Sequence, residues 1–316
     1  MLEGIVTKST GSWYDVKSAD GTITKCRIKG KFRIDNLKLT NPVAVGDHVQ
    51  WTLDDVEDNV GTIREITPRR NYVLRQSPRK KHFLHLLASN IDQAILIVTI
   101  VEPDIKVGFI DRFLMMTEPY SIPVTIVFNK ADLYGEDELT YYSYLKAVYT
   151  NIGYHVILTS NEDGTGIEEL RAALVDKTSL IAGQSGVGKS TLINTIEPEL
   201  DIRTGEISDY SGKGQHTTTF AEMHELPAGG AIIDTPGIKT LGFSHLEVQD
   251  VAHNFREFFE LSEGCRFNNC AHRNEPHCAV KEAVENGEVS DVRYDNYLQI
   301  IAEIEDQNYW ERHSDV

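Results

Sequence analysis

The feature that most restricts the fold is a glycine-rich loop between a strand-like and a helix-like run. Gly183-Gln184-Ser185-Gly186-Val187-Gly188-Lys189-Ser190 matches the phosphate-loop pattern G-x-x-x-x-G-K-[ST], with the apolar TSLIA before it and STLINTI after it. Glycines let backbone N–H groups and the helix N-terminus converge on phosphate oxygens. We therefore predict a nucleotide site at the end of a sheet strand, and we include Thr191, the next residue, in it.

A second motif, Asn129-Lys130-Ala131-Asp132, follows the apolar run IPVTIVF and indicates a guanine nucleotide. The Asp132 carboxylate can accept hydrogen bonds from the N1–H and N2–H₂ groups of guanine, which adenine does not present. Asn129 and Lys130 are expected to tie the base to the phosphate loop. Thr159-Ser160-Asn161 ends another apolar run, and we predict that Ser160 lies in a short backbone loop against guanine.

The terminal phosphate and a Mg²⁺ ion are predicted to meet groups from three segments. Lys189 is expected to reach the terminal phosphates, and Ser190 to bind Mg²⁺. Asp234 and Gly237 in AIIDTPG resemble the DxxG motif, in which the Asp orients Mg²⁺ through water and the Gly amide contacts the γ-phosphate. Within GQHTTT we predict that Thr218 binds Mg²⁺ when γ-phosphate is present, with Thr217 as the alternative.

Hydrolysis needs a group that orients the attacking water. Many GTPases use a Gln directly after the DxxG glycine, but here Ile238 occupies that position and cannot form a hydrogen bond. His216 is the nearest candidate, because an imidazole can orient water or accept its proton near neutral pH. Alternatively, His216 never meets the nucleotide. We expect slow hydrolysis by the free protein, accelerated when a partner orders this segment.

The pattern of apolar runs divides the chain into three predicted domains. Residues 1–80 hold short β-rich runs and turn signals without helical periodicity, which suits a five-stranded β-barrel of the OB type. Residues 81–243 alternate apolar strands with helix-like segments, which indicates an α/β domain with a parallel sheet. Residues 244–316 are helix-like and carry the cysteine cluster. We expect residues 68–81, which are rich in Arg and Lys, to link the first two domains.

The formal charge of −17 is unevenly distributed along the chain. Residues 1–90 hold 15 Lys and Arg against 10 Asp and Glu, whereas the remainder holds 16 against 38. The basic end is therefore the candidate RNA contact, although a merely solvated basic surface is the alternative. Aromatic residues among these charges could stack on bases, although most are expected in the core; they are Trp13, Tyr14, Phe32, Trp51 and Tyr72.

Cys265, Cys270, His272 and Cys278 lie within 14 residues and provide the ligand set of a closed, tetrahedral Zn²⁺ site. All four positions are filled by protein, so we predict one structural zinc ion that stabilises a small helical domain. His277 is the alternative imidazole ligand. Cys26 stands alone in the predicted barrel, and we expect it to pack in the core.

In ordinary GTPases the phosphate loop precedes the guanine motif, whereas here the guanine motif comes about fifty residues earlier. A circular permutation explains this order, because loops at strand ends assemble the site wherever the chain begins. With its barrel, permuted GTPase motifs and zinc cluster, the chain resembles the RsgA (YjeQ/YloQ) family of bacterial small-ribosomal-subunit assembly GTPases. The family pattern also favours His272 over His277.

The resemblance implies binding of GTP, GDP and Mg²⁺, contact with the 30S subunit and its rRNA, and hydrolysis stimulated by the particle. Two other functions stay open: a GTPase acting on tRNA or another RNA, and a ribosome-binding module whose nucleotide site is vestigial. The start of the chain lacks the pattern of an export signal, and its longest apolar run is too short to span a bilayer. We expect a cytoplasmic monomer that does not enter a membrane.

Overall fold

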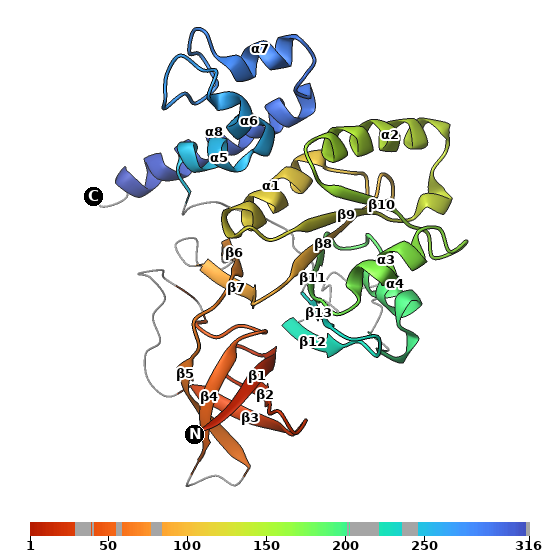
Figure 1. The fold of residues 1–316 in the computed structure, drawn as a ribbon, viewed down its shortest axis with the longest axis vertical. Coiled ribbons are helices and arrows are strands. Elements are labelled where there is room, and N and C mark those ends of the chain that lie inside the picture. The colour runs from red at the N-terminus through yellow and green to blue at the C-terminus, as the bar shows by residue number, and fades with distance from the viewer. Residues whose placement is uncertain are drawn as a thin grey trace.

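The computed structural model describes residues 1–28, 39, 41–54, 59–76, 84–200, 202, 221–235 and 246–313. A β-barrel, an α/β region and a helical C-terminal region follow one another along the chain (Figure 1). This confirms the predicted combination of fold types. Among the described residues, no helix combines the length and the apolar character that crossing a bilayer requires.

Five strands form the barrel: β1 (Leu2–Ser9), β2 (Tyr14–Lys17), β3 (Ile23–Ile28), β4 (His48–Leu53) and β5 (Val60–Ile66). They are hydrogen-bonded in the order β1-β2-β3-β5-β4, and β4 pairs back with β1 to close the barrel. The core includes Tyr14, Cys26 and Trp51. Of the aromatic residues proposed to stack on bases, Tyr14 and Trp51 are therefore core residues, whereas Trp13 is exposed.

The α/β region contains one mostly parallel sheet with the spatial order β10-β9-β8-β11-β13-β12. Its strands are β8 (Gln93–Val98), β9 (Val124–Phe128), β10 (His155–Leu158), β11 (Thr178–Gly183), β12 (Ala221–Glu225) and β13 (Ala231–Asp234). Only β12 runs antiparallel to its neighbour within this order, and it also pairs with β1 of the barrel. The two sheets are thus continuous.

The basic stretch expected to be a linker contains a strand. Strand β6 (Tyr72–Gln76) pairs with β7 (Leu84–Ser89) in a separate two-stranded sheet. Residues 68–81 were expected to link the first two domains, and the described part of this stretch includes β6, whose hydrogen-bond partner is β7. The predicted boundary at residue 80 lies between these paired strands, outside the described residues, and the division into three domains stays a prediction.

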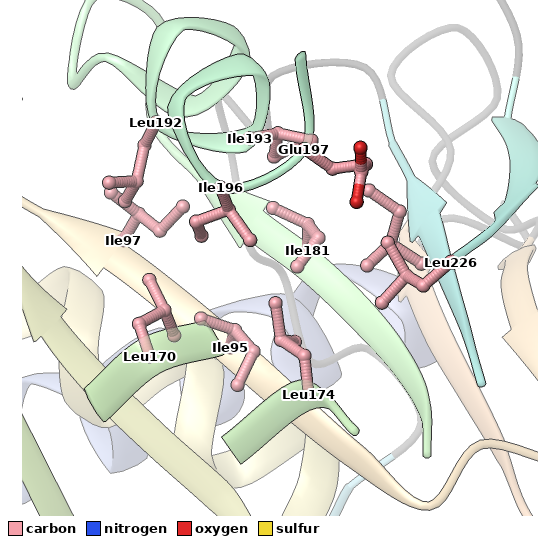
Figure 2. A pocket seen from close by; sticks show the side chains of 11 residues that line it. Ile95, Ile97, Leu170, Leu174, Ile181, Leu192, Ile193, Ile196, Glu197 and Leu226 are labelled. Carbon is pink, nitrogen blue, oxygen red and sulfur yellow. The ribbon is translucent and has the colours of Figure 1, made fainter. Parts of the chain in front are cut away.

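Helices cover both faces of the parallel sheet. Helices α1 (Val107–Thr117) and α2 (Glu136–Asn151) pack on one face, while α3 (Ile167–Leu174) and α4 (Lys189–Ile196) pack on the other. Residues of β8 alternate between the two cores, as the two-residue period of a strand requires. Figure 2 shows apolar side chains of α3 and α4 against Ile95, Ile97 and Ile181, a packing that holds α4 at the sheet.

The C-terminal region consists of α5 (Val248–Asn254), α6 (Arg256–Ser262), α7 (Ala279–Glu285) and α8 (Asp291–His313). Its buried residues, among them Phe255, Phe258 and Tyr297, belong to the same apolar cluster as α1 and α2. Three short 3₁₀ turns complete the described helices: η1 (Glu118–Tyr120), η2 (Ala131–Leu133) and η3 (Pro198–Leu200). The C-terminal region therefore shares a core with the α/β region.

Candidate nucleotide and metal sites

The phosphate loop joins β11, which ends at Gly183, to α4, which begins at Lys189. Gly186 and Gly188 both have a φ of +88°, in the left-handed region that favours glycine. A Cβ on Gly188 would lie 2.6 Å from Asn129 Nδ2, so the guanine motif also requires a glycine at this position. Val187 is buried in the core beneath α3 and α4 and anchors the loop.

The Lys189 ammonium is hydrogen-bonded to the backbone of the phosphate loop. Its Nζ donates to the carbonyl oxygens of Gly183 at 3.0 Å and Gln184 at 2.7 Å. Burial lowers the pKa of Lys189 to about 8, although the nearby Asp234 carboxylate opposes this shift. The negative charge of a phosphate at this position would favour the protonated amine. Ser190 and Thr191 occupy the first turn of α4, and their roles toward Mg²⁺ and phosphate stay predictions.

Asn129 joins the guanine motif to the phosphate loop. Its Nδ2 donates to the Val187 carbonyl oxygen at 2.9 Å, and its Oδ1 accepts from the Thr159 hydroxyl at 2.9 Å. The Tyr134 hydroxyl donates to the Asn129 carbonyl oxygen at 2.8 Å. Thr159 and Tyr134 were not predicted from the sequence as supporting residues, although Thr159 directly precedes the predicted Ser160. Two segments 58 residues apart in the chain therefore meet at one edge of the sheet.

Asp132 lies beside Ser160, whose hydroxyl donates to Asp132 Oδ1 at 2.8 Å. The backbone N–H of Ala131 donates to the Thr159 carbonyl oxygen at 3.0 Å, which holds the two predicted guanine segments together. Asp132 is exposed, so its carboxylate can accept hydrogen bonds from a ligand. Lys130, with φ of +64°, turns its ammonium to the carbonyl oxygen of Glu102.

Asp234 ends β13 in the same sheet, and it is buried. Parallel strands β9, β10, β11 and β13 therefore bring the predicted motifs to their common carboxyl edge. The predicted Thr217, Thr218, His216 and Gly237 lie outside the described residues, as does Ile238.

Three sulfur atoms and one imidazole gather in the C-terminal region. The ligand atoms of Cys265, Cys270, His272 and Cys278 all lie within 4.8 Å of one another. Cys265 Sγ lies 3.9 Å from Cys278 Sγ, and His272 Nδ1 lies 3.6 and 3.4 Å from these two atoms. Tetrahedral zinc, with bonds of about 2.3 Å to sulfur and about 2.0 Å to nitrogen, places neighbouring ligands about 3.5–3.8 Å apart. The four residues fit a zinc ion, and His277 is not part of this group.

Electrostatics also favour a cation in this cluster. Burial raises the pKa of the Cys270 thiol to about 12, and the neighbouring sulfurs of Cys278 and Cys265 add to the shift. Burial lowers the pKa of His272, which favours the neutral imidazole that binds metals. A divalent cation would stabilise the thiolates that this environment otherwise disfavours.

Comparisons with known proteins agree with this arrangement. The model of the RsgA GTPase family matches residues 66–244, and that of the RsgA N-terminal domain matches residues 3–63. A small ribosomal subunit biogenesis GTPase RsgA from Flavobacterium psychrophilum is 48% identical over 309 residues, covering 98% of this chain and 94% of the relative. Another from Cytophaga hutchinsonii is 51% identical over 302 residues, covering 96% and 98%.

Two solved structures extend over nearly the whole chain. YjeQ from Thermotoga maritima is 36% identical with a TM-score of 0.74, and the match covers 96% of this chain and 98% of that one. YloQ, a circularly permuted GTPase, is 32% identical with a TM-score of 0.71, and the match covers 97% and 96%. The barrel, the sheet and the helical C-terminal region therefore occur together in these structures as well.

Proposed function

Because the chain belongs to the RsgA family of small ribosomal subunit biogenesis GTPases, we propose that it binds the 30S subunit in its GTP-bound form and hydrolyses GTP there during late assembly. Family membership confirms the resemblance inferred from the sequence and identifies the chain as a GTP hydrolase. Release of the protein once the particle is mature would follow hydrolysis.

The contact between Asn129 and Val187 is the observation that best supports this function. It holds Asp132, the acceptor for guanine, and Lys189, the cation for phosphate, on one edge of the sheet. We assign the guanine base to Asp132, Asn129 and Ser160, and the phosphates to residues 183–191. Mg²⁺ would be held by Ser190 and Thr218, with Asp234 acting through water. In this assignment, all of these groups act on one and the same bound GTP molecule.

The metal cluster is proposed to hold one structural zinc ion. A closed set of four protein ligands leaves no position for water or substrate, so the ion contributes to folding rather than to hydrolysis. The protein is further proposed to be cytoplasmic and monomeric, with its barrel and linking basic residues against rRNA. Exposed Trp13 is the described barrel aromatic best placed to stack on a base.

Co-sedimentation with isolated 30S and 50S subunits tests the proposed partner. We expect binding to 30S with a non-hydrolysable GTP analogue, weaker binding with GDP, and none to 50S. Lys189→Ala should abolish hydrolysis and the nucleotide dependence of binding, whereas Lys146→Ala, on the exposed side of α2, serves as the control. Binding to tRNA in place of 30S, or an unchanged cellular role of Lys189→Ala, would contradict the proposal.

Hydrolysis is proposed to depend on His216 and to be accelerated by the subunit. His216→Ala should reduce the stimulated rate strongly and leave GTP affinity unchanged, because the imidazole acts on water rather than on the nucleotide. Single-turnover hydrolysis with and without 30S measures both effects. Equal rates for the variant and the natural protein would assign water orientation to another group.

A further inference from the structure

Helix α8 carries a buried arginine whose partners lie on other helices. Arg293 is 2% exposed, and its guanidinium donates to Asp111 Oδ1 on α1 at 2.6 Å and to both carboxylate oxygens of Glu257 on α6 at 2.7 and 2.8 Å. Asp111 also accepts from the Tyr149 hydroxyl at 2.9 Å and from Asn296 Nδ2 at 2.5 Å. Removing either Arg293 or Asp111 would leave an unpaired charge in the protein interior, so this ion pair holds α8 tightly on α1.

The adjacent face of α8 holds the loop that carries the metal ligands. The Tyr294 hydroxyl donates to the His272 carbonyl oxygen at 2.7 Å, and the Tyr297 hydroxyl donates to the Ala271 carbonyl oxygen at 2.7 Å. Residues three apart in the sequence lie on one side of a helix. Arg293 and Asn296, which contact Asp111, therefore lie on one face of α8. Tyr294 and Tyr297 lie on the neighbouring face. One turn of α8 therefore contacts both the α/β region and the metal loop.

Packed aromatic rings fill the space between these two sets of contacts. The Arg293 guanidinium lies 4.2 Å from the centroid of Phe255, whose ring packs 5.1 Å from Phe258 and 5.3 Å from Tyr297. The Phe258 ring lies 5.9 Å from the imidazole of His272. Buried groups in contact thus connect Asp111 continuously to a predicted metal ligand.

We propose that α8 couples the occupancy of the metal site to the docking of the C-terminal region on α1. The bound metal orders the loop of residues 265–278, the loop holds the two tyrosines, and α8 in turn holds Arg293 on Asp111. Coupling between two sites is reciprocal. Weakening the contact between Arg293 and Asp111 therefore weakens metal retention. Removing the metal in turn weakens the packing of α8 on α1.

This coupling extends toward the nucleotide site. Helix α1 follows the segment after β8 that includes Glu102, and the Glu102 carbonyl oxygen accepts a hydrogen bond from the Lys130 ammonium in the guanine motif. Helix α1, which Arg293 contacts, therefore begins five residues after a contact with the guanine motif. This inference rests on the zinc site proposed above.

The test compares zinc release from the full-length protein, from Asp111→Asn and from the matched control Asp104→Asn, which alters an exposed carboxylate just before α1. Zinc content is measured first, and release is then followed with a chromogenic chelator. We expect about tenfold faster release from Asp111→Asn, within the range of coupled sites, and no change in the control. Equal release from a folded Asp111→Asn overturns the coupling and leaves the metal site intact.

Hydrogen exchange in the natural protein gives a second measurement that needs no variant. Chelation is expected to accelerate amide exchange in α1 as well as in α8. Protection of α1 that is unchanged after zinc removal overturns the proposal even if Asp111→Asn does not fold. A purified chain that holds no zinc overturns both the coupling and the metal site.

Discussion

The pKa of Lys189 predicts that nucleotide affinity depends on pH. Burial lowers this pKa to about 8 in the free protein. Bound phosphate raises it, because the opposite charge favours the ammonium. Below pH 8 the amine is charged in both states, so affinity is constant. Above pH 8 the free protein must take up a proton on binding, so affinity falls.

The size of the effect follows from the protonated fraction of free Lys189. That fraction decreases from about nine tenths at pH 7 to about one tenth at pH 9, which corresponds to about tenfold weaker binding, or about 1.4 kcal/mol. Titration of the protein with a fluorescent GDP analogue at constant ionic strength and Mg²⁺ concentration measures this change. Lys189→Arg is the matched control, because arginine stays charged over the whole range and its variant should show a flat profile.

Two outcomes would refute the reasoning about Lys189. A change of less than about twofold between pH 7 and pH 9 would mean that the ammonium is not desolvated in the free protein. An equal decrease in Lys189→Arg would assign the titration to the nucleotide or to another side chain.

Three other substitutions test the guanine contact, the packing of the phosphate loop and the buried ion pair between Arg69 and Asp47. Asp132→Asn removes an acceptor of two charge-assisted hydrogen bonds and should weaken GTP binding at least about 100-fold by calorimetry, while improving binding of xanthosine triphosphate, which has a carbonyl in place of the 2-amino group. Gly188→Ala places a Cβ 2.6 Å from Asn129 Nδ2 at a φ of +88°, and should destabilise the protein by about 1–3 kcal/mol in thermal melts and weaken nucleotide binding. Arg69→Ala leaves the fully buried Asp47 without its cation and should lower the free energy of unfolding by about 3–5 kcal/mol in urea; a loss below about 1 kcal/mol would contradict this.

The local motifs of this chain could be predicted from the sequence, because each is a short run of residues whose types and spacing indicate one kind of binding site. The phosphate loop does begin where β11 ends, and Asn129 does follow β9. The eight residues of the phosphate loop and the four residues of the guanine motif are sufficient to predict these positions. Alternating apolar runs likewise predicted the parallel sheet, since both faces of such a sheet are buried.

Contacts between distant segments could not be predicted in this way. The pairing of β6 with β7 was not predicted, because the stretch of residues 68–81 was interpreted from its Arg and Lys residues. The burial of Arg293 runs against the strong preference of arginine for the surface, and only the three-dimensional placement of Asp111 and Glu257 accounts for it. Periodicity along the chain contains no information on such partners.

Circular permutation has a mechanical consequence that follows from these distant contacts. The chain leaves β13 at Asp234, and it is anchored again where the C-terminal region binds the α/β region. There Arg256 donates to both carboxylate oxygens of Glu118, at 2.8 and 3.1 Å, and its guanidinium lies 4.0 Å from the centroid of Tyr154. Residues 236–245, which include the predicted γ-phosphate contact Gly237, therefore connect two fixed ends. In an unpermuted GTPase the corresponding segment continues into the same domain. Here the predicted Gly237 contact with γ-phosphate lies on a connection whose far side is held on the α/β region by Arg256 and by the buried Arg293.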